Sequence, residues 1–103
     1  MTVKWTPLAR KHLRHTANYI QTNEGSRSYQ TFTNNIIEWQ EILSRMPEMG
    51  SLEPLLLHRS VPYRSIVINK LNKFIYHIHE DVLIIDDFWD TRREPKNLTS
   101  TIE

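Results

Sequence analysis

The stretch YRSIVINKLNKFIYHIHEDVLIIDDFWDTRREP, which runs from Tyr63 to Pro95, decides the fold of this chain. It contains three runs rich in Ile, Val, Phe and Tyr, separated by short polar breaks. The runs are residues 63–68, 73–79 and 82–89. Such runs, bounded by Asn, Asp and Lys, are typical of strands joined by hairpins. The stretch therefore predicts a meander of three strands, whose second turn is the pair Glu80-Asp81.

The two faces of this meander differ in composition. Side chains alternate between faces along a strand, so turns at Lys70-Leu71 and Glu80-Asp81 assign each residue to a face. The predicted core face is mostly aromatic and aliphatic: Tyr63, Val67, Phe74, Tyr76, Ile78, Leu83, Ile85 and Trp89. The opposite face mixes cations and histidines with apolar residues: Arg64, Ile66, Ile68, Lys73, Ile75, His77, His79, Ile84, Asp86 and Phe88. This mixed face is the candidate working face. Asp87 falls on the core face, where the sequence supplies no reason for a carboxylate.

Two helices are predicted before the meander. Thr6-Pro7 begins the first, because threonine caps an orphan amide and proline suits the first helical position. Gly25 ends it, since glycine tolerates the left-handed turn that closes many helices. Ser26 is the expected cap of the second helix, and Pro47 stops it.

Each predicted helix carries an apolar stripe at helical spacing. The first stripe is Ala9, Leu13, Ala17 and Ile20, and the second is Tyr29, Phe32, Ile36, Trp39, Leu43 and Met46. Only a few residues join the helices, so an antiparallel helical hairpin that packs on the sheet is expected. Residues 2–5 alternate in polarity and predict a short strand ahead of the first helix.

Composition indicates one small soluble domain over residues 1–103, with a flexible tail at about 96–103. The chain has no cysteine, so thiolate metal sites and disulfides are excluded. No apolar run approaches the roughly 20 residues that span a bilayer, and the N-terminus lacks a signal-peptide layout. A cytoplasmic protein without membrane contact is expected. The formal charge is only +1, but Arg10, Lys11 and Arg14 are clustered in the first helix.

Four cations could bind phosphate: Arg64 and Lys73 on the mixed face, and Arg92 and Arg93 after the last strand. Arginine offers paired donors to a phosphate and lysine a point charge. The alternative is a solvated surface with ordinary salt bridges to Asp86 or Asp90.

The spacing His77-x-His79 places two imidazoles on one face of a strand. In the projected register His77 lies beside Arg64, where it could act as a general acid or base in phosphodiester cleavage. Two partly exposed histidines without a role are the alternative. A metal site formed with Asp86 is disfavoured because the nearby cations repel a divalent ion. We therefore expect no metal and no cofactor.

Four motifs carry a family resemblance. They are YR-x-I-V from Tyr63, K-x-I-Y-x-I from Lys73, D-x-L-I-I from Asp81 and W-D-x-R-R-x-P from Trp89. Together with the opening VKWTPLARKHLRHTANYI, they resemble the RelE/ParE superfamily of toxins from bacterial type II toxin–antitoxin operons, the plasmid-stabilisation type. The resemblance implies an α+β fold of order β-α-α-β-β-β, in which the N-terminal helical hairpin packs on an antiparallel β-sheet.

The ribonuclease branch of that superfamily implies ribosome-dependent cleavage of messenger RNA without a metal. Arg64, Lys73 and Arg93 match its basic positions, and His77 would serve as the acid or base. We assign Arg92 and His79 to substrate binding. Two positions differ from the branch: a second basic position is Ile66 here, and residues 96–99 contain no tyrosine.

The other branch inhibits DNA gyrase without catalysis and implies a His-Gly-Arg-type segment at the end of the last strand. Here the segment reads Asp90-Thr91-Arg92, which keeps only the arginine. Messenger cleavage is our first expectation; gyrase inhibition, or an inactive relative that only binds protein, is the alternative. Every toxin branch implies a cognate antitoxin in a hetero-oligomer, and the apolar residues of the mixed face are expected to be its contact.

Overall fold

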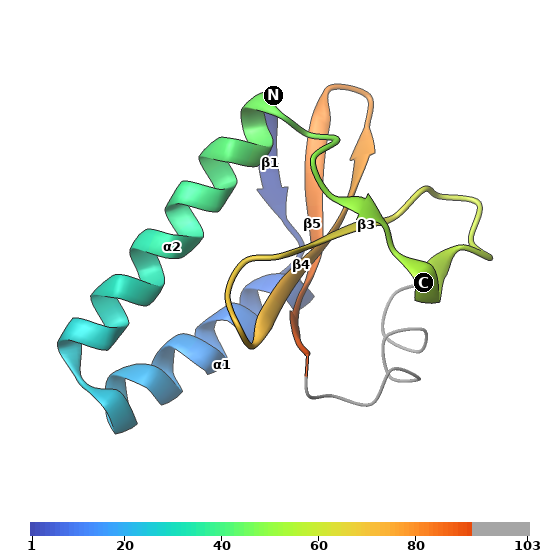
Figure 1. Cartoon of the computed structure of the whole chain (residues 1–103). Coiled ribbons are helices and arrows are strands. Elements are labelled where there is room, and N and C mark those ends of the chain that lie inside the picture. Colours follow the sequence, from blue (N-terminus) through green and yellow to red (C-terminus); the bar gives the residue numbers. More distant parts are fainter. Residues whose placement is uncertain (92–103) are drawn as a thin grey trace.

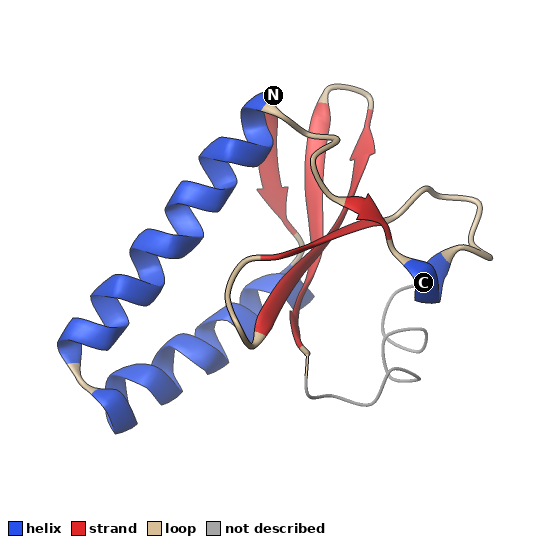
Figure 2. Cartoon of the chain, in the orientation of Figure 1, coloured by secondary structure: helices blue, strands red, loops and turns tan. Residues whose placement is uncertain are grey.

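The computed structural model describes residues 1–91. The elements in chain order are β1 (Thr2–Trp5), α1 (Pro7–Glu24), α2 (Ser26–Arg45), β2 (Ser51–Leu52), the 3₁₀ helix η1 (Pro54–Leu56), β3 (Arg64–Val67), β4 (Asn72–His79) and β5 (Val82–Asp90). Both helices lie on one side of a twisted sheet, and η1 with its flanking loops lies on the other (Figures 1 and 2). Neither helix of this region has the length and apolar character needed to cross a membrane.

The sheet has five strands in the order β1-β5-β4-β3-β2. The strands β3, β4 and β5 pair antiparallel, as the meander predicted. The short strand β2, which the sequence did not predict, pairs antiparallel with β3, whereas β1 pairs parallel with β5. The predicted α+β class and helical hairpin are confirmed, but the sheet is mixed. The physical reason is the helical connection: a long crossover allows parallel pairing, which a short turn does not.

The predicted helix ends agree closely with the structure. Thr6 caps α1, because its hydroxyl accepts a hydrogen bond from the Ala9 amide at 3.1 Å, and Pro7 is the first helical residue. Gly25, at φ 91°, is the single residue between the helices. It takes the N-cap position of α2 that the sequence gave to Ser26. The helix ends at Arg45, two residues before the predicted stop at Pro47.

The main core lies between the helices and the sheet. The predicted helical stripes contribute to it: Ala9, Phe32, Ile36 and Leu43 are buried, and Leu13, Ala17, Ile20 and Trp39 pack against them. The sheet contributes Ile68, Phe74, Tyr76, Leu83, Ile85 and Phe88. Edge-on ring contacts join Trp5 to Phe74 and Phe32 to Phe88.

A β-bulge in β5 changes which residues reach this core. Tyr76 pairs with Ile85 but Ile75 pairs with Asp87, so β5 carries one extra residue, Asp86, at this point. An extra residue reverses the alternation of the residues that follow the bulge, here from Phe88 onward. The predicted faces of Phe88 and Trp89 are therefore wrong: Phe88 joins the main core, and Trp89 lies on the opposite face.

The register of β3 is also one residue away from the prediction. Val67 pairs with Lys73, and Arg64 with Tyr76. The turn is longer than two residues because Asn69 Oδ1 accepts hydrogen bonds from the Leu71 and Asn72 amides, each at 2.9 Å. This shift moves β3 residues to the other face. The mixed-face assignments of Arg64, Ile66 and Ile68 are consequently wrong, as are the core-face assignments of Tyr63 and exposed Val67.

Candidate functional site

The far face, meaning the side of the sheet away from the helices, carries a second apolar cluster. The cluster consists of Leu56, Tyr63, Ile75 and Trp89, with Leu55 and Val61 packed against it. The connector of residues 53–63 therefore covers part of this face. Most of the apolar residues expected to contact the antitoxin are therefore not exposed on this face, because Ile75 is buried here and Ile66, Ile68 and Phe88 face the helices.

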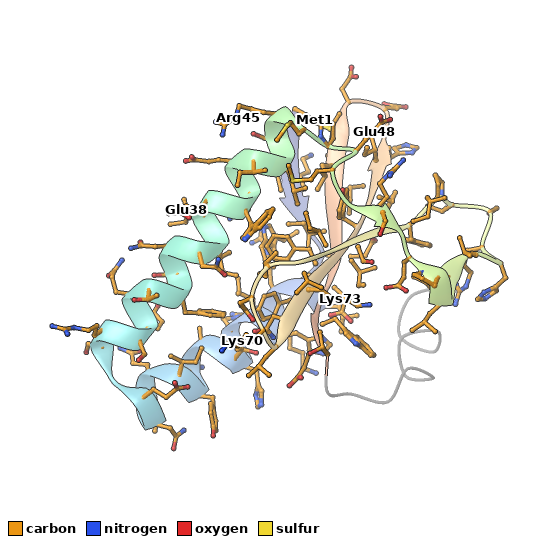
Figure 3. The ribbon with its side chains drawn as sticks, viewed as in Figure 1. Met1, Glu38, Arg45, Glu48, Lys70 and Lys73 are labelled. Carbon is orange, nitrogen blue, oxygen red and sulfur yellow. The ribbon has the colours of Figure 1, made fainter. Side chains whose placement is uncertain are left out.

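A partly buried ion pair joins this connector to the sheet. Lys73 of β4 lies on the side away from α2 (Figure 3), and its ammonium group contacts Glu53, whose side chain is 1% exposed. Glu53 Oε2 also accepts a hydrogen bond from the Leu55 amide at 3.0 Å. Burial raises the pKa of Glu53, but the Leu55 amide and Lys73 together outweigh burial and hold the pKa below 4.5. Lys73 is thus already engaged by a carboxylate.

His77 forms a hydrogen-bonded pair with Asp86 on the far face. Its Nδ1 lies 2.6 Å from Asp86 Oδ2, and its ring meets Tyr63 edge-on with centroids 5.4 Å apart. Burial raises the pKa of Asp86; His77 lowers it, and Asp87 raises it further, so that the net pKa is above 3.8. A carboxylate on Nδ1 fixes the ring and leaves Nε2 as the nitrogen for other partners. This arrangement suits either proton transfer or a purely structural contact.

The remaining predicted site residues do not join this pair. Arg64 lies opposite Tyr76, on the helix side, and donates from Nη1 to the Gly50 carbonyl at 2.7 Å. The prediction that His77 sits beside Arg64 is therefore wrong. His79 is exposed at the β4–β5 turn, 3.8 Å from Glu80. Arg92 and Arg93 lie outside the described residues.

Glu53 and Tyr63 were not predicted site residues, and Asp86 was considered only as a salt-bridge partner of the cations or as a metal ligand. The position of Glu53 directly before Pro54 is only a weak sequence signal for a site residue. Tyr63 was assigned to the opposite face of the sheet. The pairing of Asp86 with His77 depends on the fold, since the register of β4 against β5 brings them together. Within residues 1–91, no group of three or more histidines and carboxylates could hold a metal ion.

Comparison with known proteins gives a family from one profile and a fold from solved structures. The profile described as "ParE toxin of type II toxin-antitoxin system, parDE" matches residues 3–95. No curated protein matches the chain. The fold is similar to "Chromosomal ParDE TA system from P. aeruginosa", at TM-score 0.68 and 17% identity over 87% of this chain and 95% of that one. It is also similar to "The structure of YoeB dimer from Staphylococcus aureus", at TM-score 0.52 and 19% identity over 85% and 93%.

Proposed function

This chain belongs to the ParE toxin family of type II toxin–antitoxin systems, and from that membership we propose that it arrests growth by binding DNA gyrase, without catalysing a reaction. The RelE/ParE resemblance of the sequence is confirmed, and the protein is the toxin component of such a system. The sequence placed messenger cleavage first. The geometry of the described residues favours the alternative.

One observation carries this proposal: the cations expected to clamp a phosphate do not converge. Arg64 faces the helices and bonds a backbone carbonyl, whereas Lys73 is on the far face and pairs with buried Glu53. Messenger cleavage needs donors placed around one phosphate and a group that moves the 2′-hydroxyl proton. Because they lie on opposite faces of the sheet, Arg64 and Lys73 cannot meet the first requirement together, and a binding mechanism does not need it.

The two mechanisms differ in stoichiometry, which gives the test. A binding inhibitor must match the number of its targets, whereas an enzyme turns over. We expect the purified toxin to block plasmid supercoiling only when its amount is comparable to that of gyrase, so that more gyrase requires more toxin. We expect it to leave messenger RNA intact on translating ribosomes. Cut messenger at substoichiometric toxin, with supercoiling unaffected, would overturn the proposal.

Messenger cleavage stays the second candidate because of the His77–Asp86 pair. A carboxylate that orients an imidazole is a common arrangement for a general acid or base. His77 is 18% exposed at its side chain, so a substrate could reach it at the surface. In this case Arg92 and Arg93, which follow the described residues in the sequence, are the first candidates for the phosphate contacts.

A cognate antitoxin is the second proposed partner. The P. aeruginosa structure is described as a ParDE system, and family membership supports the same pairing here. The test is co-expression of this chain with the product of the adjacent reading frame. We expect the two to purify as one hetero-oligomer and growth to be restored; a toxin that stays alone and active would count against the pairing.

A further inference from the structure

The C-terminal half of α1, the start of α2 and the β3–β4 turn border a groove with two compartments. The larger compartment, of about 560 Å³, is lined chiefly by α2 and the turn, and the smaller, of about 380 Å³, chiefly by α1. Figure 1 shows the turn reaching from the sheet toward the helical hairpin. Ile20, Glu24, Leu71 and Asn72 line both compartments, which therefore form one continuous surface.

Asn72 places an unused amide in this groove. Its backbone amide donates to Asn69 Oδ1, but its side-chain amide has no hydrogen-bond partner within residues 1–91, although Asn72 is only 7% exposed. A buried polar group without a partner is costly, and folded proteins keep few of them. A side-chain amide carries donors and an acceptor side by side, as a peptide group does. Asn72 therefore indicates a ligand that offers both a donor and an acceptor.

The smaller compartment favours a positive charge. Glu24 is the final residue of α1, whose last turn contains no basic residue, and it forms no salt bridge with a described residue. The C-terminal end of a helix carries partial negative charge and favours cations. Asp90 lines the same compartment and already interacts within the chain, so Glu24 is the carboxylate that a cation would meet.

Apolar side chains beside Glu24 suit the stem of a lysine or arginine. Tyr19 and Leu71 are exposed there, and Ile20 lies between the compartments. Long cationic side chains lay their methylene groups on such surface, and the ring of a tyrosine attracts the charged end.

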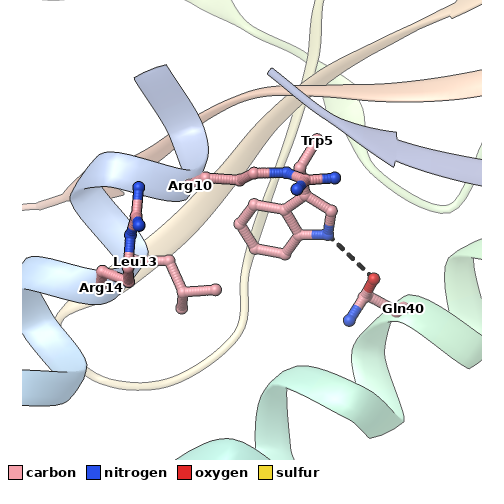
Figure 4. A pocket seen from close by; sticks show the side chains of 5 residues that line it. All are labelled: Trp5, Arg10, Leu13, Arg14 and Gln40. Carbon is pink, nitrogen blue, oxygen red and sulfur yellow. Dashed lines mark hydrogen bonds between the residues drawn. The ribbon is translucent and has the colours of Figure 1, made fainter. Parts of the chain in front are cut away.

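The opposite end of the helical hairpin has the reverse charge. A second cleft there is lined by Trp5, Leu13 and Gln40 together with two arginines, Arg10 and Arg14, as Figure 4 shows. A basic segment is repelled by these arginines and attracted to Glu24. The charge of the two ends therefore selects the groove, and not the second cleft, for a basic partner.

We propose that the groove binds an extended basic segment of gyrase, in which a main-chain peptide group bonds to Asn72 and a lysine or arginine pairs with Glu24. The inference rests on the proposed function and names the surface that performs it. Nucleic acid is disfavoured, because Glu24 and Asp90 repel phosphates. An isolated nucleobase, which also offers a donor and an acceptor to an amide, is the competing ligand.

The first test observes the Asn72 amide directly. Its side-chain signals, in an NMR amide spectrum of the isotope-labelled full chain, are identified by their absence from Asn72→Ala. The probe is a blocked tripeptide with a central lysine, and the controls are the same tripeptide with a central glutamate and adenosine. We expect the lysine peptide alone to shift the Asn72 signals. No shift, or an equal shift with either control, would overturn the inference.

Matched variants extend the test to gyrase. Asn72→Ala and Glu24→Lys should each raise the amount of toxin that blocks supercoiling by about tenfold or more, the scale of losing an interface anchor. Glu38→Lys, an equal charge change on the exposed side of α2 (Figure 3), should inhibit like the wild type. Both groove variants should melt at the wild-type temperature or above, because the Asn72 side chain loses no hydrogen bond and lysine suits the end of α1.

The two measurements separate this inference from the proposed function. If the wild type inhibits gyrase and the groove variants inhibit equally well, the inference is wrong and the proposed function stands. If the lysine peptide shifts Asn72 but the wild type does not inhibit gyrase, the proposed target is wrong, and the groove stands as a site for a basic segment of another protein.

Discussion

Two neighbouring aspartates at the β5 bulge hold histidines on opposite faces of the sheet. Asp87 Oδ1 lies 2.6 Å from His12 Nδ1 on α1, and Asp86 Oδ2 lies 2.6 Å from His77 Nδ1 on β4. The bond lengths are equal, but the surroundings differ: the Asp87 side chain is fully buried, whereas that of Asp86 is 12% exposed.

The difference in burial separates a structural contact from a candidate functional one. The His12–Asp87 pair joins residues 75 positions apart and ties α1 to the sheet. Asp87 Oδ2 has no hydrogen-bond partner among the described residues, so His12 is the main compensation for a buried carboxylate. The His77–Asp86 pair joins adjacent strands at the edge of solvent, where water can replace either partner. The same histidine–carboxylate hydrogen bond is therefore expected to contribute more to the free energy of unfolding at buried Asp87 than at Asp86.

The largest expected effect is that of His12→Ala. Removing the imidazole leaves the Asp87 carboxylate buried without its donor, and breaking a buried pair in this way costs about 3 kcal/mol. Urea unfolding of the purified variant measures the loss.

His77→Ala is the matched control for that measurement. Asp86 can hydrate once His77 is gone, so the expected cost is about 1 kcal/mol, the scale of one hydrogen bond. Equal losses in the two variants would mean that burial does not distinguish the pairs.

Deleting Asp86 should have an intermediate effect. Without the extra residue β5 alternates regularly, so Phe88 and Trp89 keep their faces while Asp87 moves to the far face. His12 loses its partner, but no unpaired carboxylate stays buried, and we expect a loss of about 1–2 kcal/mol. The deletion variant should fold and show the tryptophan fluorescence of the parent. Failure to fold would show that the bulge is essential to the sheet.

The pH dependence of stability sharpens the comparison at Asp86. Its pKa is raised above 3.8 in the folded state, so between pH 3.8 and the folded pKa the native state binds more protons than the unfolded state. The contribution of Asp86 to the free energy of unfolding is therefore lost as pH rises through that window. Glu53, whose pKa is lowered, acts in the opposite direction, with stability lost as pH falls below 4.5.

The variant Asp86→Asn isolates the Asp86 contribution, because Glu53 is present in both proteins. The stability of the wild type relative to Asp86→Asn should fall as pH rises from 3.8, in unfolding curves measured at several pH values. A difference that stays constant with pH would contradict the raised pKa.

The smallest expected effect is that of His77→Ala on activity. A toxin that binds gyrase has no proton to transfer, so supercoiling inhibition by the folded variant should stay within about twofold of wild type. If messenger cleavage is the activity, the same variant should slow single-turnover cleavage by about a hundredfold. His79→Ala, at the exposed turn, should slow cleavage less than His77→Ala.

Much of the fold could be predicted because local signals were strong. Thr6-Pro7, Gly25 and the two apolar stripes specified the helices, and the Glu80-Asp81 turn specified the last hairpin. The candidate site was less predictable, since it depends on the face of the sheet on which each side chain lies, and not only on where the strands begin and end. One residue of register in β3 and one bulge in β5 moved Arg64, Phe88 and Trp89 to faces the alternation had not given them.

Although it did not predict β2 or η1, the sequence by itself determined the order of the two helices and of β1, β3, β4 and β5, the start of α1, the hairpin at Glu80-Asp81 and the family. Each depends on neighbouring residues, whose caps, turns and periodicity act over a few positions. Only the tertiary structure decided that β1 runs parallel to β5, that Lys73 pairs with Glu53, and that His12 meets Asp87. These contacts join residues 20 or more positions apart. Which residues meet depends on how the whole chain buries its carboxylates and aromatic rings, and no local sequence pattern encodes this.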